Sequence, residues 1–126
     1  MPLTRISLRA GKSPAYRRAI VDSVYLAMRE TFNVPENDRF MTVEQFEAAD
    51  FDFGADYLGI DRSDDLVIVQ ITANNTRTVE QKKALIAAIA DHLATNPGVR
   101  PQDVFINLVE CAKENWSFGM GVAQYA

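Results

Sequence analysis

The 126-residue chain has little of what several classes of protein depend on. It contains one cysteine, Cys111, so no disulfide can form within the chain and no oxidising compartment is indicated. It contains one histidine, His92, without cysteine or carboxylate partners at ligand spacing, so we predict no metal site. Its 13 basic residues are outnumbered by 17 acidic residues, and the net charge of −4 argues against a nucleic-acid partner.

Long apolar runs are also missing. Each apolar stretch is interrupted by charge or ends too soon to span a bilayer, so we expect no membrane partner. The first residues reach Arg5 and Arg9 before an apolar region can form, which argues against a signal peptide. No linker composition divides the sequence. Because 48% of its residues are hydrophobic, the chain can bury a sizeable core. We predict one domain, residues 1–126, in the cytoplasm.

The chain does contain one pattern that occurs twice. In the first unit, apolar residues over positions 3–8 predict a short strand. Ser13, followed by a proline, is typical of a helix start, and Asn33, with a proline two residues later, is typical of a helix end. Residues 40–46 form a second extended run. Between the helix ends, apolar residues recur every three or four positions, as on the buried side of an amphipathic helix: Ile20, Val21, Val24, Met28 and Phe32.

The second unit begins with residues 66–71, which are nearly all apolar and β-branched, as in a strand buried on both faces of a sheet. Thr78 and Gln81 match a capping box at the start of a helix. An Asn-Pro-Gly sequence at residues 96–98 ends that helix, and residues 104–109 form the next strand. The predicted buried face of the helix consists of Leu85, Ile86, Ile89 and Leu93.

Together the two strand–helix–strand units, approximately residues 2–47 and 66–109, predict a small α/β (α+β) domain. We expect one mixed sheet with both helices on one face, followed by a C-terminal segment. The acidic and aromatic segment between the units, residues 48–65, is predicted to be a hairpin or loop that covers the sheet edge.

Pro2 is the first candidate for chemistry, because it directly follows the initiator methionine. A small residue at this position normally permits removal of Met1, which would leave proline with a secondary amine in place of an amide. Such a nitrogen can accept or donate a proton, or attack a carbonyl group to form an iminium ion. Since a predicted strand begins at the next residue, we expect the nitrogen to be held in a fixed position.

Three features occur together in this sequence: the proline at the head of the first strand, the doubled strand–helix–strand pattern and the sequence TVEQKKAL at residues 78–85. In these features the sequence resembles the tautomerase superfamily. Within the superfamily, VPENDRF at residues 34–40 and NWSFGMG at residues 115–121 resemble the malonate semialdehyde decarboxylase branch. The resemblance covers nearly the whole chain. It implies a tautomerase-like homotrimer with active sites near each N-terminal proline and with no metal or organic cofactor.

The same resemblance implies roles for individual residues. Pro2 and Asp38 correspond to the catalytic proline and aspartate, and Arg77 corresponds to an arginine that binds the substrate carboxylate. A guanidinium suits this role because it binds a carboxylate through two hydrogen bonds and stays charged. Trp116 and Phe118 correspond to aromatic residues that form the pocket wall, where desolvation favours loss of carbon dioxide.

Asn75 is a departure from that branch, whose pattern has a pair of arginines before the second helix. Asn75 stands where the other arginine is expected, and we include it among the candidates for substrate binding. The loss of one cation weakens the binding of a carboxylate and changes the electric field at Pro2, so the native substrate can differ from that of the branch.

We therefore predict a cofactor-free carbon–carbon lyase that decarboxylates a small 3-oxo carboxylic acid such as malonate semialdehyde. The same residues also suit a hydratase or dehalogenase, in which Asp38 directs water at an unsaturated acid. They suit a keto–enol tautomerase as well, in which a neutral Pro2 moves the proton. A protein of another class, a non-catalytic trimeric binding or structural module, would keep the fold alone.

Some of these residues also have ordinary structural interpretations. Asp38 fits a turn, and Arg77 fits a solvated side chain beside a helix start. Trp116 and Phe118 fit a core or a subunit interface. Cys111 fits an inert buried thiol.

Overall fold

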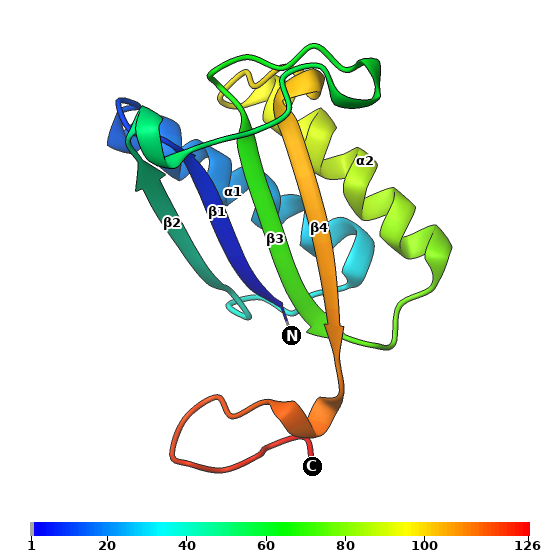
Figure 1. Cartoon of the computed structure of the whole chain (residues 1–126). Helices are drawn as coiled ribbons and strands as arrows, with labels where there is room; N and C mark the ends of the chain where they lie inside the picture. The colour runs from blue at the N-terminus through cyan, green and yellow to red at the C-terminus, as the bar shows by residue number, and fades with distance from the viewer. Residues whose placement is uncertain (1) are drawn as a thin grey trace.

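In the computed structural model, which describes residues 2–126, two helices pack on one face of a four-stranded sheet (Figure 1). In chain order the elements are β1 (Leu3–Arg9), α1 (Pro14–Phe32), β2 (Phe40–Phe46), β3 (Val67–Asn74), α2 (Val79–Thr95) and β4 (Val104–Cys111). The strand order is β2-β1-β3-β4. The β1–β2 and β3–β4 pairs are parallel and the central β1–β3 pair is antiparallel. The predicted mixed sheet of two β-α-β units is confirmed.

Both helices begin where the sequence predicts. At the start of α1, the Ser13 hydroxyl accepts a hydrogen bond from the Tyr16 N–H at 3.1 Å. Asn33 follows the helix in the left-handed conformation, with a φ of 52°. At the start of α2, Thr78 and Gln81 make both hydrogen bonds of the predicted capping box. These local interactions stabilise the orphan backbone groups of the helix ends.

The hydrophobic core lies between the helices and the sheet. Most of the predicted helix residues are buried there, but Ile86 is 43% exposed, which corrects the prediction for this residue. Ile86 lies about 100° around the helix from Leu85, at the edge of the buried stripe. The core includes Ile6, Ile20, Val24, Met28, Val67, Val69, Ile71, Leu85, Ile89 and Leu93.

The other face of the sheet has no helix over it among the described residues. Burial alternates along β3, where Val69 and Ile71 are fully buried but Ile68 and Gln70 are half-buried. The prediction that this strand is buried on both faces is therefore wrong for a single chain. Exposed apolar side chains on the open face include Leu3, Phe40, Phe105 and Val109.

β3 and β4 extend beyond their predicted ends at residues 71 and 109. Their parallel pairing continues from Val67–Val104 to Asn74–Cys111. Polar residues interrupt the apolar pattern near both ends, which is why composition alone places the ends too early. The extension brings Asn74 and Cys111 to the edge of the sheet where β1 begins.

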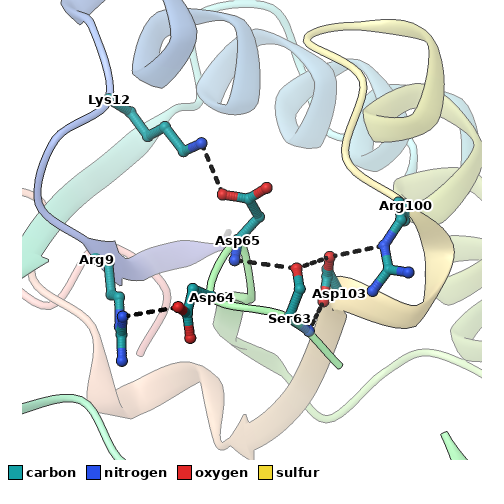
Figure 2. Close-up of polar contacts among 7 residues, drawn as sticks. All are labelled: Arg9, Lys12, Ser63, Asp64, Asp65, Arg100 and Asp103. Carbon is teal, nitrogen blue, oxygen red and sulfur yellow. Dashed lines mark hydrogen bonds and ion pairs between the residues drawn. The ribbon is translucent and has the colours of Figure 1, made fainter. Parts of the chain in front are cut away.

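The connecting segment, residues 48–65, crosses the opposite end of the sheet as a loop with two 3₁₀ turns rather than as a hairpin (Figure 1). Figure 2 shows how its end is held. The buried Asp103 carboxylate accepts hydrogen bonds from the Ser63 N–H and hydroxyl, both at 2.7 Å, and from Arg100 Nε at 3.1 Å. Two further ion pairs fasten this loop to the last residue of β1 and to the turn after it. They are Arg9–Asp64 at 3.1 Å and Lys12–Asp65 at 2.7 Å.

Neither of the two α-helices in the described part of the chain has the length and hydropathy of a transmembrane segment.

Candidate active site

The predicted catalytic residues lie at one edge of the sheet. Pro2 precedes β1, Asp38 precedes β2 and Arg77 follows β3. Because β1 and β2 are parallel and β3 runs antiparallel to β1, these three chain segments share the same edge. The edge is at the lower end of the sheet in Figure 1, beside the N label, and the C-terminal segment after β4 lies below it.

Pro2 is buried at the head of β1. The next residue, Leu3, pairs with Phe40 of β2 and with Thr72 of β3. The proline therefore precedes a residue that has a neighbouring strand on each side, which fixes its position in the middle of the sheet edge. The predicted removal of Met1 concerns a residue outside the described range.

Asp38 is 8% exposed, in the loop between α1 and β2. Its N–H donates to the Pro35 carbonyl at 3.1 Å, and the N–H of Asn37 donates to the Tyr25 hydroxyl at 3.1 Å. The Arg39 guanidinium lies 4.3 Å from the centroid of the same Tyr25 ring. Asp38 therefore closes a turn, as its ordinary structural interpretation expects, and its carboxylate is buried in a loop that Tyr25 fastens to α1.

Arg77 is half-buried and contacts the end of α1. Its Nη2 donates to the Phe32 carbonyl at 3.0 Å, and the guanidinium lies 4.7 Å from the centroid of the Phe32 ring. Burial lowers the pKa of Arg77, and the nearby Asp38 carboxylate acts in the opposite direction. The guanidinium nevertheless stays cationic at neutral pH. Asp38 therefore lies near enough to Arg77 to interact with it electrostatically, although Asp38 and Pro2 line neither of the two pockets described below.

A polar pocket of about 420 Å³ lies beside Arg77. Its lining includes Asn74, Lys113 and Tyr125, none of which the sequence predicts as site residues. Asn74 is 7% exposed, and its Oδ1 has no hydrogen-bond partner among the described residues. The parallel register of β3 and β4, which composition does not reveal, brings Asn74 and the segment that begins after β4 together.

An apolar pocket of about 510 Å³ lies at the same edge, on the open face of the sheet. Trp116 and Phe118 line this pocket, and their rings stack with 5.7 Å between the ring centroids. Phe118 also contacts Phe40 at 6.1 Å and Tyr125 at 5.4 Å between ring centroids. Because Tyr125 lines the polar pocket, these aromatic residues of the C-terminal segment form a wall next to both pockets.

Three other residues that the sequence singles out take different places. Asn75 is exposed, lines neither pocket in the described structure, and donates its N–H to the Cys111 carbonyl at 3.0 Å. Cys111 is half-buried and lines the apolar pocket. His92 Nε2 lies 2.8 Å from a carboxylate oxygen of Glu30, across the two helices. Within residues 2–126 no three His, Cys, Asp or Glu side chains cluster as metal ligands.

Comparison with known proteins identifies the family. A family model described as "Tautomerase enzyme" matches residues 38–119. This chain belongs to the tautomerase family. Probable tautomerase YusQ of Bacillus subtilis (strain 168) is 40% identical to this tautomerase over 124 residues, which are 98% of each protein.

Two solved structures of malonate semialdehyde decarboxylase are also similar to the tautomerase. The FG41 enzyme inhibited by 3-bromopropiolate is 40% identical with a TM-score of 0.92, covering 98% of this chain and 93% of that chain. A second structure, solved as wild type, proline-to-alanine mutant and inactivated enzyme to explain decarboxylase and hydratase activities, is 32% identical. Its TM-score is 0.93, covering 98% of this chain and 95% of that one.

A fused 4-OT symmetric trimer, 23% identical with a TM-score of 0.76 over 98% of this chain and 94% of that chain, shares the fold. This chain is therefore a tautomerase superfamily enzyme, structurally close to malonate semialdehyde decarboxylase. Membership of an enzyme family argues against the non-catalytic module that the sequence left open.

Proposed function

We propose that this tautomerase decarboxylates a small 3-oxo carboxylic acid such as malonate semialdehyde, with Pro2, Asp38 and Arg77 as catalytic residues. The observation that best supports the proposal is the electrostatic interaction of Arg77 with Asp38 at the sheet edge where Pro2 precedes β1. The similarity to two malonate semialdehyde decarboxylases supports the same reaction. The proposed chemistry uses no metal or organic cofactor.

Arg77 is the proposed carboxylate-binding group. The guanidinium carries five N–H groups, and its Nη2 donates one of them to the Phe32 carbonyl. The other N–H groups can bind an anion. The contact with Phe32 holds the guanidinium in one orientation before the substrate arrives. Trp116 and Phe118 line the apolar pocket, and Phe118 contacts Tyr125 of the polar pocket that holds Arg77. In the proposed reaction they form an apolar wall, where desolvation favours a transition state in which charge is dispersed.

Pro2 is the proposed electron sink, once Met1 has been removed. In its cationic form the amine donates a hydrogen bond to the 3-oxo group. In the covalent route the amine first gives up its proton, its lone pair then attacks the carbonyl carbon, and loss of water leaves an iminium ion. The bond between C2 and the carboxylate carbon then breaks. Its electron pair becomes part of an enol or an enamine, and carbon dioxide leaves. A proton adds to C2, and in the covalent route water releases the aldehyde and regenerates the amine.

Asp38 is proposed to keep the Pro2 amine protonated or to orient a water molecule. A neighbouring carboxylate raises the pKa of an amine, whereas a neighbouring guanidinium lowers it. If the cationic form of Pro2 is the active one, activity falls as pH rises through its pKa. If Pro2 acts as a neutral base, as in a tautomerase reaction, activity falls on acidification.

We also propose a homotrimer of single-domain subunits, each spanning residues 1–126, that acts in the cytoplasm on a small carboxylic acid. The open sheet face leaves Phe40 50% exposed and Phe105 49% exposed, and neighbouring apolar side chains enlarge this surface. An apolar surface of this kind is typical of a subunit contact. The fused 4-OT neighbour, which shares the fold, is a symmetric trimer.

A hydratase is the second candidate function, because one of the similar decarboxylases has both activities. Both reactions are tested by incubating the enzyme with malonate semialdehyde and separately with 3-bromopropiolate. With malonate semialdehyde we expect carbon dioxide and acetaldehyde. With 3-bromopropiolate we expect a covalent adduct on residue 2, since this compound inhibits the FG41 enzyme. A Pro2→Ala variant with wild-type carbon dioxide release would overturn the proposal. Adduct formation without carbon dioxide release would favour the hydratase.

A further inference from the structure

We propose that Lys113 is a second cation for the substrate carboxylate, which acts together with Arg77 in place of the arginine that the sequence lacks at position 75. The inference deepens the proposed function, because it names a further group that recognises the acid at the same site. It assigns to the polar pocket a small carboxylic acid that also bears an O–H donor.

The two cations reach the pocket from neighbouring strands. Arg77 lies three residues after the end of β3, and Lys113 lies two residues after the end of β4, where it begins a 3₁₀ turn. The two strands are parallel and end side by side, with Asn74 opposite Cys111. Both cationic side chains line the same pocket of about 420 Å³. Lys113 is exposed, but its position after β4 places it in the lining of the pocket that Arg77 also lines.

The charges around the pocket favour an anion. The other nearby lysine, Lys82, is paired with Glu110 at 2.6 Å between Nζ and Oε1. Among the residues that the structure describes, neither Lys113 nor Arg77 forms an ion pair. The Asp38 carboxylate interacts with Arg77 and offsets part of its charge. Lys113 adds a second positive charge to the lining of the same pocket, which favours an anionic ligand there.

Asn74 points independently to a ligand. It is 7% exposed and lines the same pocket, and its Oδ1 has no hydrogen-bond partner within the described chain. A buried acceptor without a partner costs free energy, so such atoms usually have a partner in the functional state. A ligand hydroxyl satisfies it. The combination of Arg77, Lys113 and Asn74 therefore fits an acid whose carbonyl is hydrated or reduced to a hydroxyl.

The test measures binding of 3-hydroxypropanoate, an unreactive acid with both groups, by isothermal titration calorimetry. Lys113→Met removes the charge and keeps the aliphatic stem, and Lys113→Arg restores the charge. Lys83→Ala is the control, since Lys83 is exposed like Lys113 but lies on α2 and lines neither pocket. We expect Lys113→Met to weaken binding roughly threefold to tenfold. Lys113→Arg should bind nearly as well as the wild type, and Lys83→Ala should bind equally well. Propane-1,3-diol, which lacks the carboxylate, should not discriminate between the variants.

The inference is overturned if wild type and Lys113→Met bind 3-hydroxypropanoate equally, or if the wild type does not bind it. Its failure is distinguishable from failure of the proposed reaction. Binding that depends on Lys113, without carbon dioxide release from malonate semialdehyde, supports the site and contradicts the reaction. Carbon dioxide release with an unchanged KM in Lys113→Met supports the reaction and contradicts the role of Lys113. Thermal unfolding of each variant verifies that all are folded.

Discussion

The guanidinium of Arg77 donates from Nη2 to the backbone carbonyl of Phe32 at 3.0 Å and lies 4.7 Å from the centroid of its ring. The contact joins the loop before α2 to the last residue of α1, whose carbonyl has no partner within its own helix. The cation proposed to bind the substrate is therefore held in place by the end of the other helix.

Arg77→Lys tests the importance of this arrangement. Lysine keeps the charge but loses the planar group that can stack on Phe32 and bind a carboxylate through two hydrogen bonds. We expect KM for a 3-oxo acid to rise on the order of tenfold or more, with a smaller change in kcat. Arg18→Lys is the matched control, because Arg18 is exposed and pairs with Asp22 on the surface of α1. Steady-state kinetics that do not distinguish the two variants would contradict the role of Arg77.

Tyr25→Phe tests whether the loop that contains Asp38 must be held in position. The change removes the hydroxyl that accepts from the Asn37 N–H and keeps the ring under Arg39. We expect kcat to fall roughly twofold to tenfold, the range that follows from the loss of one hydrogen bond, and the pH–rate profile to shift. Tyr16→Phe is the control, since no hydrogen bond of the Tyr16 hydroxyl exists among the described residues. A drop in melting temperature with unchanged kcat and pH profile would show that Tyr25 matters only for stability.

Asp103→Asn tests the polar cluster of Figure 2. Burial opposes ionisation of Asp103, but hydrogen bonds from Arg100 and Ser63 outweigh it and hold the pKa of the carboxyl below its ordinary value. The stability that this carboxylate contributes is therefore present above the unfolded pKa of about 4 and is lost as pH falls toward the lower folded value. We expect Asp103→Asn to lower the free energy of unfolding by roughly 1–3 kcal/mol at neutral pH, and the difference from wild type to shrink in acid.

Denaturant unfolding at fixed protein concentration measures this effect, because subunit association also contributes to stability. Asp64→Asn is the control: its ion pair with Arg9 is on the surface and its side chain is 74% exposed, so we expect a change below about 1 kcal/mol. Equal destabilisation by both variants at every pH would contradict the account of Asp103.

Phe105→Glu tests the proposed homotrimer. Phe105 is 49% exposed on the open sheet face of the single chain. If this face is the subunit contact, assembly of the variant would bury the charge of the new glutamate, which is costly, so we expect the variant to shift toward monomers. Leu26→Glu is the control, since Leu26 is similarly exposed, at 46%, but lies on α1. Sedimentation velocity distinguishes the two variants. Trimers of Phe105→Glu, or monomers of the wild type, would show that this face is not the contact.

Sequence alone predicts the parts of this fold that depend on near neighbours in the chain. The cap at Ser13, the left-handed Asn33 and the capping box at Thr78 follow from the hydrogen bonds that those side chains make within one turn. The shared edge of Pro2, Asp38 and Arg77 depends on the antiparallel pairing of β1 with β3, which the sequence does not predict, and the roles of these residues came from the family resemblance.

The places of Asn74 and Lys113 could not be predicted in this way. They depend on the register between β3 and β4, which continues past the end of the apolar pattern to Asn74 and Cys111. Likewise, the sequence of β3 predicts burial on both faces, whereas one chain buries only the face under the helices. The open face is a property that a second copy of the chain can change, and no local pattern reports it.

The most direct test of the central claim is the intact mass of the protein purified from cells without an N-terminal tag, together with its N-terminal peptide. The account predicts a chain shorter by one methionine residue, with Pro2 as its first residue and a free secondary amine. An active preparation with the mass of the full 126-residue chain would contradict the claim, because the nitrogen of Pro2 would then be an amide.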